Sequence, residues 1–359
     1  MQIPLFANSL APYQDAIAAR LAEVAASRQY ILGPELEAFE REFADYLGVE
    51  HVVGVGNGTD ALTIALRALG VRPGDEVVCP SLTFYATAEA IVNAGATPVF
   101  CDVDPDTWCA TAETVRPMLS ERTRAIVPVH LFGNVAPVLE LRKLGVPVLE
   151  DAAQAAGASL GGTMAGALGD AATFSFFPSK NLPCLGDGGA ISTNDAQVAE
   201  RARVLRFHGS KDKKHHTEIG YNSRLDSMQA AVLRILLPEL DGWNEARREV
   251  AERYASAGLG EHLQLPVPTE DAQHVYHLYA ALSDDADELA RSLSEDGIGA
   301  RGYYRTPAHR QPAMERFAGA ALPVTDELAA RLLALPMGTE LEPAQVDAVV
   351  AACAGRVRS

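Results

Sequence analysis

The sequence FSFFPSKNLPCLGDGG, residues 174–189, places a lysine just after an apolar run. The run 171–177 is rich in aromatic residues and predicts a buried strand, and the glycines after it let the backbone pass close to a bulky planar group. Most lysines are surface charges. A lysine that a buried strand delivers into a cleft has a lowered pKa, however, and acts as a nucleophile or a proton carrier. Lys180 is therefore the first candidate reactive residue, with the hydroxyls of Ser175 and Ser179 as nearby donors.

Short strand-like runs alternate with helix-length segments on both sides of this stretch. Apolar residues at helical spacing in 35–47, followed by Gly48, predict a helix that ends there. Such alternation predicts an α/β fold, with a mostly parallel sheet covered by helices on both faces. Strands are expected at 51–55, 76–80, 97–103, 125–130, 147–152, 171–177 and 189–194, and further helices near 59, at 86–93 and at 196–206.

The pattern changes after about residue 238. One strand is expected at 274–282, and helices are expected at 241–257, 285–295 and 325–333. We expect a large domain over residues 1–240, including an N-terminal helical arm, and a smaller C-terminal α/β domain over residues 241–359.

Charge and cysteine content exclude several classes of protein. With 30 Lys and Arg against 47 Asp and Glu, the net charge is −17, which disfavours nucleic acid as a partner. The five cysteines show no CxxC spacing, which argues against a disulfide framework or a structural zinc site and favours a reducing, cytoplasmic location. No apolar run approaches eighteen residues, so no membrane span is expected.

The segment GVGNGTDAL, residues 54–62, lies between a predicted strand and a predicted helix. Gly58 allows a close backbone approach, and the free N–H groups from Thr59 onward would form an anion site at the helix N-terminus. An ordinary helix cap with a tight turn fits the segment as well. A dinucleotide-binding loop fits less well, because Thr59 takes the place of the third glycine in GxGxxG.

Two further residues have both a functional and a structural interpretation. Asp151 ends the run VLED, at the strand end where ligands of parallel sheets gather, and it would suit a protonated pyridine nitrogen or simply cap the next helix. Phe84 offers a stacking face for a planar ring, or packs in the core. HVYH, residues 274–277, has metal-like spacing only on a helix, and it lies in a predicted strand, so no metal site is expected.

An anion site, an aromatic platform, a strand-end aspartate and a buried lysine together meet the needs of pyridoxal phosphate. The sequence resembles the sugar aminotransferases of the DegT/DnrJ/EryC1/StrS family, which are fold type I pyridoxal phosphate enzymes. This resemblance implies a large domain with a mostly parallel, seven-stranded sheet flanked by helices. It rests on YILGPELEAFE, GNGTDALTIALRALGVRPGDEVVCP, TFYATAEAI, RTRAIVPVHLFG, EDAAQAAGA, FSFFPSKNL, GDGGAISTND, GYNSRLDSMQAAVL and YYRTPAHRQPAM.

The resemblance assigns a role to each candidate residue at the cofactor ring. Lys180 would hold the cofactor as a Schiff base and move the proton during transfer. Asp151 would pair with the ring nitrogen, Gln154 would contact the ring hydroxyl, and Phe84 would stack on the ring.

The resemblance also assigns the phosphate and substrate contacts. Gly58, Thr59 and Ser175 would hold the phosphate, and Asn222 of a partner subunit would complete that site in a homodimer. Tyr304 and His309 match a region that lines the sugar pocket. We further expect the loop KDKKHH to contact the nucleotide diphosphate through Lys211, Lys213 and Lys214, although a solvated loop is the simpler interpretation.

The resemblance implies transamination of a keto sugar nucleotide, with L-glutamate as donor. The segment HHTEIGYNSRLDSMQAA, residues 215–231, favours a carbon-three ketone over a carbon-four ketone. A dehydratase of the same fold is disfavoured because Lys180 is present and clustered cysteines are absent. A regulatory protein is disfavoured by the intact Lys180 and Asp151, and an NAD-dependent dehydrogenase would leave Lys180 unexplained.

Overall fold

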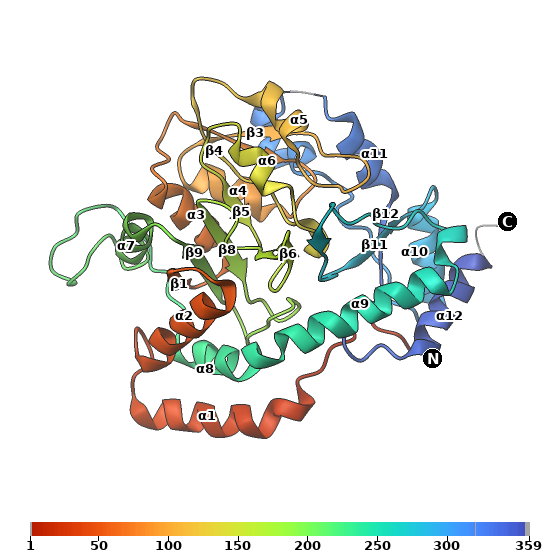
Figure 1. Cartoon of the computed structure of the whole chain (residues 1–359), viewed down its shortest axis with the longest axis horizontal. Coiled ribbons are helices and arrows are strands. Elements are labelled where there is room, and N and C mark those ends of the chain that lie inside the picture. Colours follow the sequence, from red (N-terminus) through yellow and green to blue (C-terminus); the bar gives the residue numbers. More distant parts are fainter. Residues whose placement is uncertain (1, 320, 356–359) are drawn as a thin grey trace.

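The computed structural model describes residues 2–319 and 321–355, and Figure 1 shows its central strands flanked by helices. A four-stranded sheet has the order β1 (His51–Val55), β9 (Gly189–Thr193), β8 (Ala171–Ser175) and β5 (Leu149–Asp151). A three-stranded sheet has the order β3 (Thr97–Cys101), β2 (Glu76–Pro80) and β4 (Thr123–Ile126). Strand β9 runs antiparallel to both of its neighbours, and the other pairs are parallel.

The two sheets meet edge to edge between β4 and β5. Isolated parallel bridges join Ile126 to Val148 and Val129 to Asp151. Pro128 lies between these bridges and has no N–H to donate, although its carbonyl accepts from the Asp151 N–H at 2.9 Å. The seven strands therefore lie in one row whose hydrogen-bond ladder is interrupted at Pro128, and the single continuous seven-stranded sheet that the resemblance implied is not confirmed.

Helices cover both faces of these sheets. Those of the first two thirds of the chain are α1 (Gln14–Ser27), α2 (Pro34–Leu47), α3 (Gly58–Ala68), α4 (Ala86–Asn93), α5 (Ala112–Val115), α6 (Val138–Arg142), α7 (Ala196–Leu205) and α8 (Ser227–Leu236). Helices α1, α2 and α8 pack together beneath the sheet in the view of Figure 1. The predicted helices at 86–93 and 196–206 are confirmed to within a residue.

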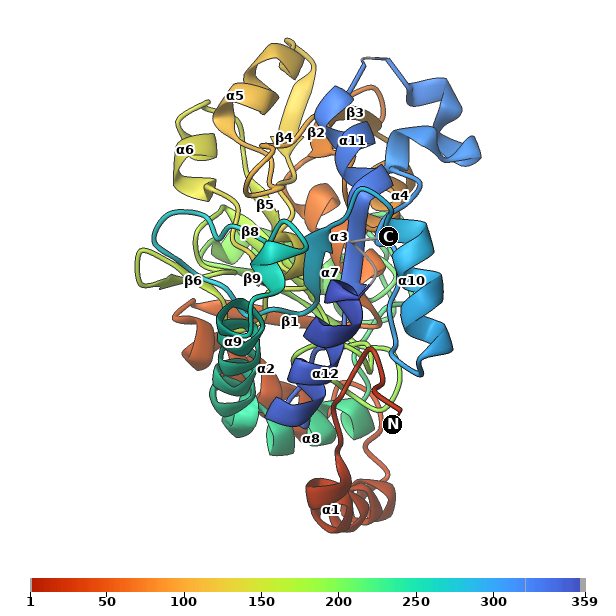
Figure 2. The same cartoon turned by 90° about the vertical axis from the view of Figure 1, so that its right-hand side faces the viewer.

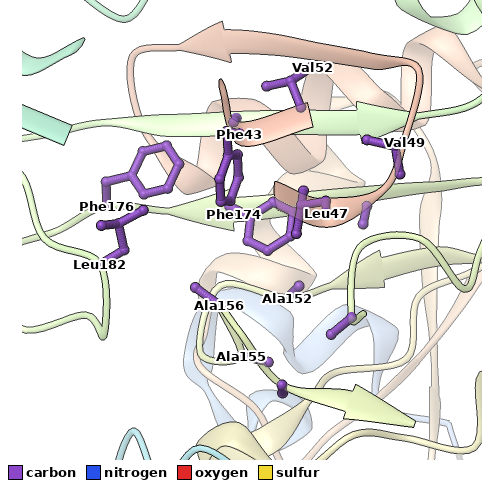
Figure 3. Close-up of a cluster of buried hydrophobic side chains, with 14 of the residues drawn as sticks. Phe43, Leu47, Val49, Val52, Ala152, Ala155, Ala156, Phe174, Phe176 and Leu182 are labelled. Atoms are coloured by element: carbon purple, nitrogen blue, oxygen red, sulfur yellow. The ribbon is translucent and has the colours of Figure 1, made fainter. Parts of the chain in front are cut away.

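Helix α2 supports the strand that leads to Lys180. Its residues Leu36, Phe39, Phe43 and Leu47 are all buried, as their spacing predicts, and the helix ends at Gly48, whose φ of 71° suits glycine. Figure 3 shows Phe43 against Phe174 of β8, with ring centroids 5.0 Å apart. The ring of Phe176 packs on that of Phe43, with centroids 5.6 Å apart. These aromatic contacts fix the end of β8 that leads into the turn with Lys180.

The C-terminal part has its own core. Strands β11 (Tyr279–Leu282) and β12 (Leu332–Leu335) pair antiparallel. They pack with α9 (Leu240–Ser256), α10 (Ala286–Glu295) and α12 (Pro343–Ala354), which Figure 2 shows from this side. Ile3 and Ala7 join this core, so the N-terminal segment packs with the C-terminal part. Helix α11 (Pro323–Arg331) precedes β12, and β6 (Ser159–Leu160), β7 (Thr163–Met164) and β10 (Ala272–Gln273) form a small separate sheet.

Two predicted C-terminal elements differ in extent. The strand expected over 274–282 covers only Tyr279–Leu282, because Tyr276 has a φ of 43° and its N–H bonds to Nδ1 of His274, which bends the backbone. The helix expected over 325–333 ends at Arg331, because Leu332 and Leu333 pair with β11. Within residues 2–319 and 321–355, no helix is both long and apolar enough to cross a bilayer.

Candidate active site

A cleft of about 620 Å³ opens at the carboxyl ends of β5 and β8. Its size is typical of a site for a cofactor or a small substrate. Strand β5 contributes Asp151, the turn after β8 contributes Lys180, and helix α3 points its N-terminus into the cleft at Gly58. The predicted residues that line it are Gly58, Thr59, Phe84, Asp151, Gln154, Ser175, Lys180 and Tyr304.

Lys180 is half-buried in a tight turn. Its backbone N–H donates to the carbonyl of Phe177 at 2.8 Å, which fixes the turn after β8. Burial lowers the pKa of the Lys180 amine to about 8, and the charge of Asp151 opposes this shift. About a tenth of the amine is therefore uncharged at pH 7, far more than at the usual lysine pKa, and the uncharged amine is the form that attacks a carbonyl.

Asp151 is buried opposite the lysine. Its Oδ2 accepts a hydrogen bond from Thr87 Oγ1 at 2.8 Å, and its Oδ1 accepts from the Ala153 N–H at 3.2 Å. Burial raises the pKa of Asp151, while these two hydrogen bonds and then the charge of Lys180 act against the rise. Thr83 bonds Thr87 at 2.8 Å and so orients the donor. The carboxylate needs a cationic partner, and a protonated pyridine nitrogen would supply one.

The N-terminus of α3 forms an anion site. Asn57 caps the helix by accepting from the Asp60 N–H at 2.8 Å, and its carbonyl accepts from the Ala61 N–H at 3.0 Å, so the N–H groups of Gly58 and Thr59 have no acceptor within the helix. A Cβ at Gly58 would lie 2.8 Å from Cβ of Ser175, so only glycine lets the helix end approach β8 this closely. The hydroxyls of Thr59 and Ser175 also line this end of the cleft. The arrangement suits a phosphate group.

The remaining wall of the cleft is formed by aromatic side chains and the amide side chain of Gln154. Phe84 is 55% exposed and lies 6.1 Å from the Tyr304 ring, so its face is free to stack on a planar ring. Gln154 is fixed at both ends, because its Oε1 accepts from the Phe132 N–H at 2.8 Å and its Nε2 donates to the Tyr304 hydroxyl at 3.2 Å. These residues, the anion site and the Lys180–Asp151 pair fit pyridoxal phosphate on the chemistry of their donors.

Comparison with protein families agrees with this geometry. The model of the DegT/DnrJ/EryC1/StrS aminotransferase family matches residues 13–354. The chain belongs to this family. Two curated relatives cover nearly all of it. A Streptomyces venezuelae dTDP-3-amino-3,4,6-trideoxy-alpha-D-glucose transaminase is 46% identical over 92% of this chain and 89% of its own. A "pleiotropic regulatory protein" of Geobacillus stearothermophilus is 44% identical over 92% of this chain and 91% of its own.

Solved structures agree with the fold. DesV of S. venezuelae in complex with a ketimine intermediate matches with a TM-score of 0.95 at 43% identity, over 100% of this chain and 99% of that chain. A Bacillus subtilis structure, ntda with bound cofactor pmp, matches with a TM-score of 0.92 at 30% identity, over 100% and 86% of the two chains. The fold is therefore that of the α/β, fold type I aminotransferases.

His309 lies away from the cleft. It is buried, with Nδ1 2.6 Å from Ser81 Oγ and Nε2 3.4 Å from Asp326 Oδ1. It lines no part of the cleft described above, and its contacts tie the segment after β2 to α11. Of the two residues expected to line a sugar pocket, the structure brings only Tyr304 to the cleft.

The other predicted residues outside the cleft lie between α7 and α8. Asn222 is exposed, accepts from the Arg224 side chain and forms an isolated bridge with Phe207. The loop before it leaves the body of the molecule beside α7 in Figure 1. All three of its lysines are exposed, with Lys211 paired to Glu200 and Lys213 above the Phe207 ring at 5.2 Å. Within one chain, Asn222 and Lys211, Lys213 and Lys214 do not line the cleft.

Sequence reasoning missed several cleft residues. His277 lines the cleft, and its Nδ1 is buried without a hydrogen-bond partner. In the sequence this residue stood out only as part of the HVYH motif, which was considered as a metal site and rejected. Thr87 faces Asp151 because it lies in the first turn of α4, four residues after Thr83. Over the described part of the chain, no group of three or more His, Cys, Asp and Glu side chains is arranged to hold a metal.

Proposed function

We propose that this chain transfers the amino group of L-glutamate to a nucleotide-linked keto sugar, with pyridoxal 5'-phosphate as cofactor. The observation that carries the proposal is one cleft that holds the half-buried Lys180, the buried Asp151 and the N-terminus of α3. Membership of an aminotransferase family supports it.

In this proposal, different residues of the cleft bind different parts of the cofactor. When bound, pyridoxal phosphate supplies an electron sink for the carbon that bears the nitrogen. The N–H groups at the start of α3 and the hydroxyls of Thr59 and Ser175 would hold its phosphate, while Phe84 would stack on the ring and Gln154 would contact the ring hydroxyl. The chain has net charge −17, and Asp60 and Asp187 also line the cleft, so these local donors must outweigh a repulsive field.

Lys180 and Asp151 carry the chemistry in this proposal. The Lys180 amine, whose pKa burial lowers to about 8, would hold the cofactor aldehyde and, when free, would serve as the group that carries a proton during transfer. Asp151 would pair with the protonated ring nitrogen, and the hydrogen bond from Thr87 to Oδ2 favours the ionised form of Asp151.

For the acceptor we propose a keto group at carbon three. The S. venezuelae transaminase acts at that position by its name, and its 46% identity extends over nearly the whole chain. A carbon-four ketone remains the alternative, and a dehydratase is a weaker one because Lys180 occupies the cleft. The name of the Geobacillus relative suggests a regulatory role as a further alternative. The intact Lys180–Asp151 pair argues against it, because a purely regulatory protein has no need of these catalytic residues.

The proposed enzyme is a cytoplasmic homodimer in which each subunit contributes residues to the active site of the other. Asn222 is exposed and outside its own cleft, as expected of a residue that completes the phosphate site of a partner. The lysines of the neighbouring loop would reach the nucleotide diphosphate of that partner. The five cysteines are all free and buried, as is common in a reducing compartment.

Two measurements test the proposed function. Borohydride trapping of the purified enzyme, followed by peptide mapping, should place the cofactor on Lys180, and Lys180→Ala should abolish turnover while leaving the melting temperature near that of the wild type. A panel of three-keto and four-keto sugar nucleotides with L-glutamate should then yield an amino sugar from a three-keto compound. A label on another lysine, or no product from any keto sugar, would overturn the proposal.

A further inference from the structure

A second, smaller cavity lies beside Lys180. It has a volume of about 70 Å³, and Lys180 lines both this cavity and the main cleft. Its other polar lining residues include Asn8 and Ser9 from the N-terminal segment, Asn181 from the turn after β8, Arg247 from α9, and Thr339. The cavity is large enough for a carboxylate group and too small for a sugar.

Arg247 is a buried cation without an anion. Its residue is 2% exposed, Nη1 donates to the Tyr276 carbonyl at 3.0 Å, and Nη2 donates to Asn8 Oδ1 at 2.9 Å. Its Nε has no partner, and among the described residues no ion pair with a carboxylate is found for Arg247, whose pKa is shifted by burial alone. Burial lowers the pKa of Arg247 to about 10, so it stays charged at neutral pH. An unpaired buried charge is costly unless a ligand neutralises it.

Two more unpartnered polar atoms lie next to the same lysine. Asn181 donates through Nδ2 to Asn244 Oδ1 at 2.8 Å and to the Val275 carbonyl at 2.9 Å, but its Oδ1 is buried without a donor. His277 Nδ1 is unpartnered as well, and burial, followed by the charges of Lys180 and Arg247, holds the pKa of His277 well below its usual range. The surroundings of Lys180 thus offer a cationic donor and a free acceptor, which match the carboxylate and the ammonium of an amino acid.

We propose that the cavity beside Lys180 binds a carboxylate of the amino-acid donor, and that Arg247 holds it. This inference rests on the proposed aminotransferase function and adds the residue that recognises the donor. The reacting amine of an amino acid is two bonds from its carboxylate, so a carboxylate site must lie near Lys180. Arg247 lines the small cavity and not the main cleft, where the proposed function places the phosphate and the sugar nucleotide, so its loss should affect the donor alone.

The test separates donor from acceptor. Arg247→Met should raise the L-glutamate concentration for half-maximal rate by about tenfold or more, because one charge-assisted contact is lost, and should leave the constant for the keto sugar nucleotide unchanged. Arg247→Lys keeps the charge and should recover part of the affinity. Calorimetric titration of the holoenzyme with glutarate, which cannot react, should show binding to the wild type and at least tenfold weaker binding to Arg247→Met.

Arg248→Gln is the matched control. This arginine is next in the chain, but its guanidinium binds Glu245 Oε2 near the surface, so the constants for both substrates and the binding of glutarate should stay at wild-type values. Melting temperatures report whether each variant folds. If Arg247→Met is unfolded, Arg247→Lys must still weaken glutarate binding without weakening that of the sugar nucleotide.

The two proposals fail in different ways. Equal changes in both constants, or unchanged glutarate binding in a folded Arg247 variant, would overturn the donor site and leave Arg247 a structural link between α9 and the N-terminal segment. If the wild type transfers no amino group from L-glutamate to any keto sugar, the proposed function itself fails.

Discussion

Thr87 controls how the buried carboxylate beside Lys180 is ionised. Burial alone would favour a neutral Asp151, and the hydrogen bond from Thr87 at 2.8 Å is the largest influence in the other direction. A hydrogen bond to a charged group is worth roughly 1.5–3 kcal/mol, which corresponds to one pKa unit or more. In the proposed function the ring nitrogen of the cofactor keeps its proton while Asp151 is ionised, so we expect this hydroxyl to extend activity to lower pH.

We expect Thr87→Val to move the acid limb of the kcat/KM profile to higher pH by about one unit. Removing the donor raises the pKa of Asp151, so the ionised form is lost earlier as pH falls. Thr87→Ser keeps the hydroxyl and should keep the wild-type profile. An unchanged acid limb in Thr87→Val would mean that Thr83 or water replaces the lost donor.

At the scale of elements, the anion site depends on the close approach of α3 to the four-stranded sheet. A Cβ at Gly58 would lie 2.8 Å from Ser175 Cβ on β8, and a Cβ at Gly189 would lie 2.5 Å from the Asn57 carbonyl carbon. Two glycines therefore bring the helix N-terminus, β8 and β9 together at one point. The distance between helix and strand, rather than a single side chain, sets the position of the phosphate.

Gly58→Ala should separate α3 from β8, lower the melting temperature by several degrees and weaken retention of the cofactor. Overpacking of this kind costs about 1–3 kcal/mol. Gly242→Ala is the control, because Gly242 lies in the first turn of α9 with no heavy atom within 4 Å of the added Cβ, so stability should be unchanged or slightly higher. Thermal unfolding with and without added cofactor measures both effects. Equal behaviour of the two variants would show that α3 tolerates the displacement.

At the scale of the whole molecule, several residues that the sequence assigned to an active site lie outside the cleft, Asn222 by resemblance and the loop lysines by their charge. Asn222 and the three loop lysines share the segment between α7 and α8, which extends away from the body of the molecule. A residue of this kind serves an active site only by reaching a second copy of the chain. The exposed loop is also the densest cationic run of a strongly acidic protein.

Mixing two inactive variants tests the shared site. Lys180→Ala and Asn222→Ala, each inactive or nearly so, should regain part of their activity once subunits exchange, because in a heterodimer both defects fall on one site and the other is intact. Subunit exchange is measured independently with labelled chains. Exchange without recovered activity would count against a shared site.

The loop lysines have a separate test. Replacing Lys211, Lys213 and Lys214 with serine should raise the KM for the sugar nucleotide on the order of tenfold, since one or two charge-assisted contacts are lost. The KM for L-glutamate should barely change, because that substrate binds near Lys180. Equal increases in both constants, or none, would leave the loop a solvated hairpin.

Local pattern determined most of the fold of this protein and the centre of its site. Apolar spacing placed α2 and the strands of the two large sheets to within a few residues, although it missed β12. The rule that ligands gather at the carboxyl ends of parallel strands placed Asp151 at the site in advance. The family resemblance named most of the residues around Lys180 and Asp151, but tertiary structure alone decided the rest. The contacts of Thr87 with Asp151, the partner of His309 and the enclosure of Arg247 beside Lys180 all depend on segments far apart in the chain. Periodicity reports which face of an element is buried, but it carries no information about what that face meets.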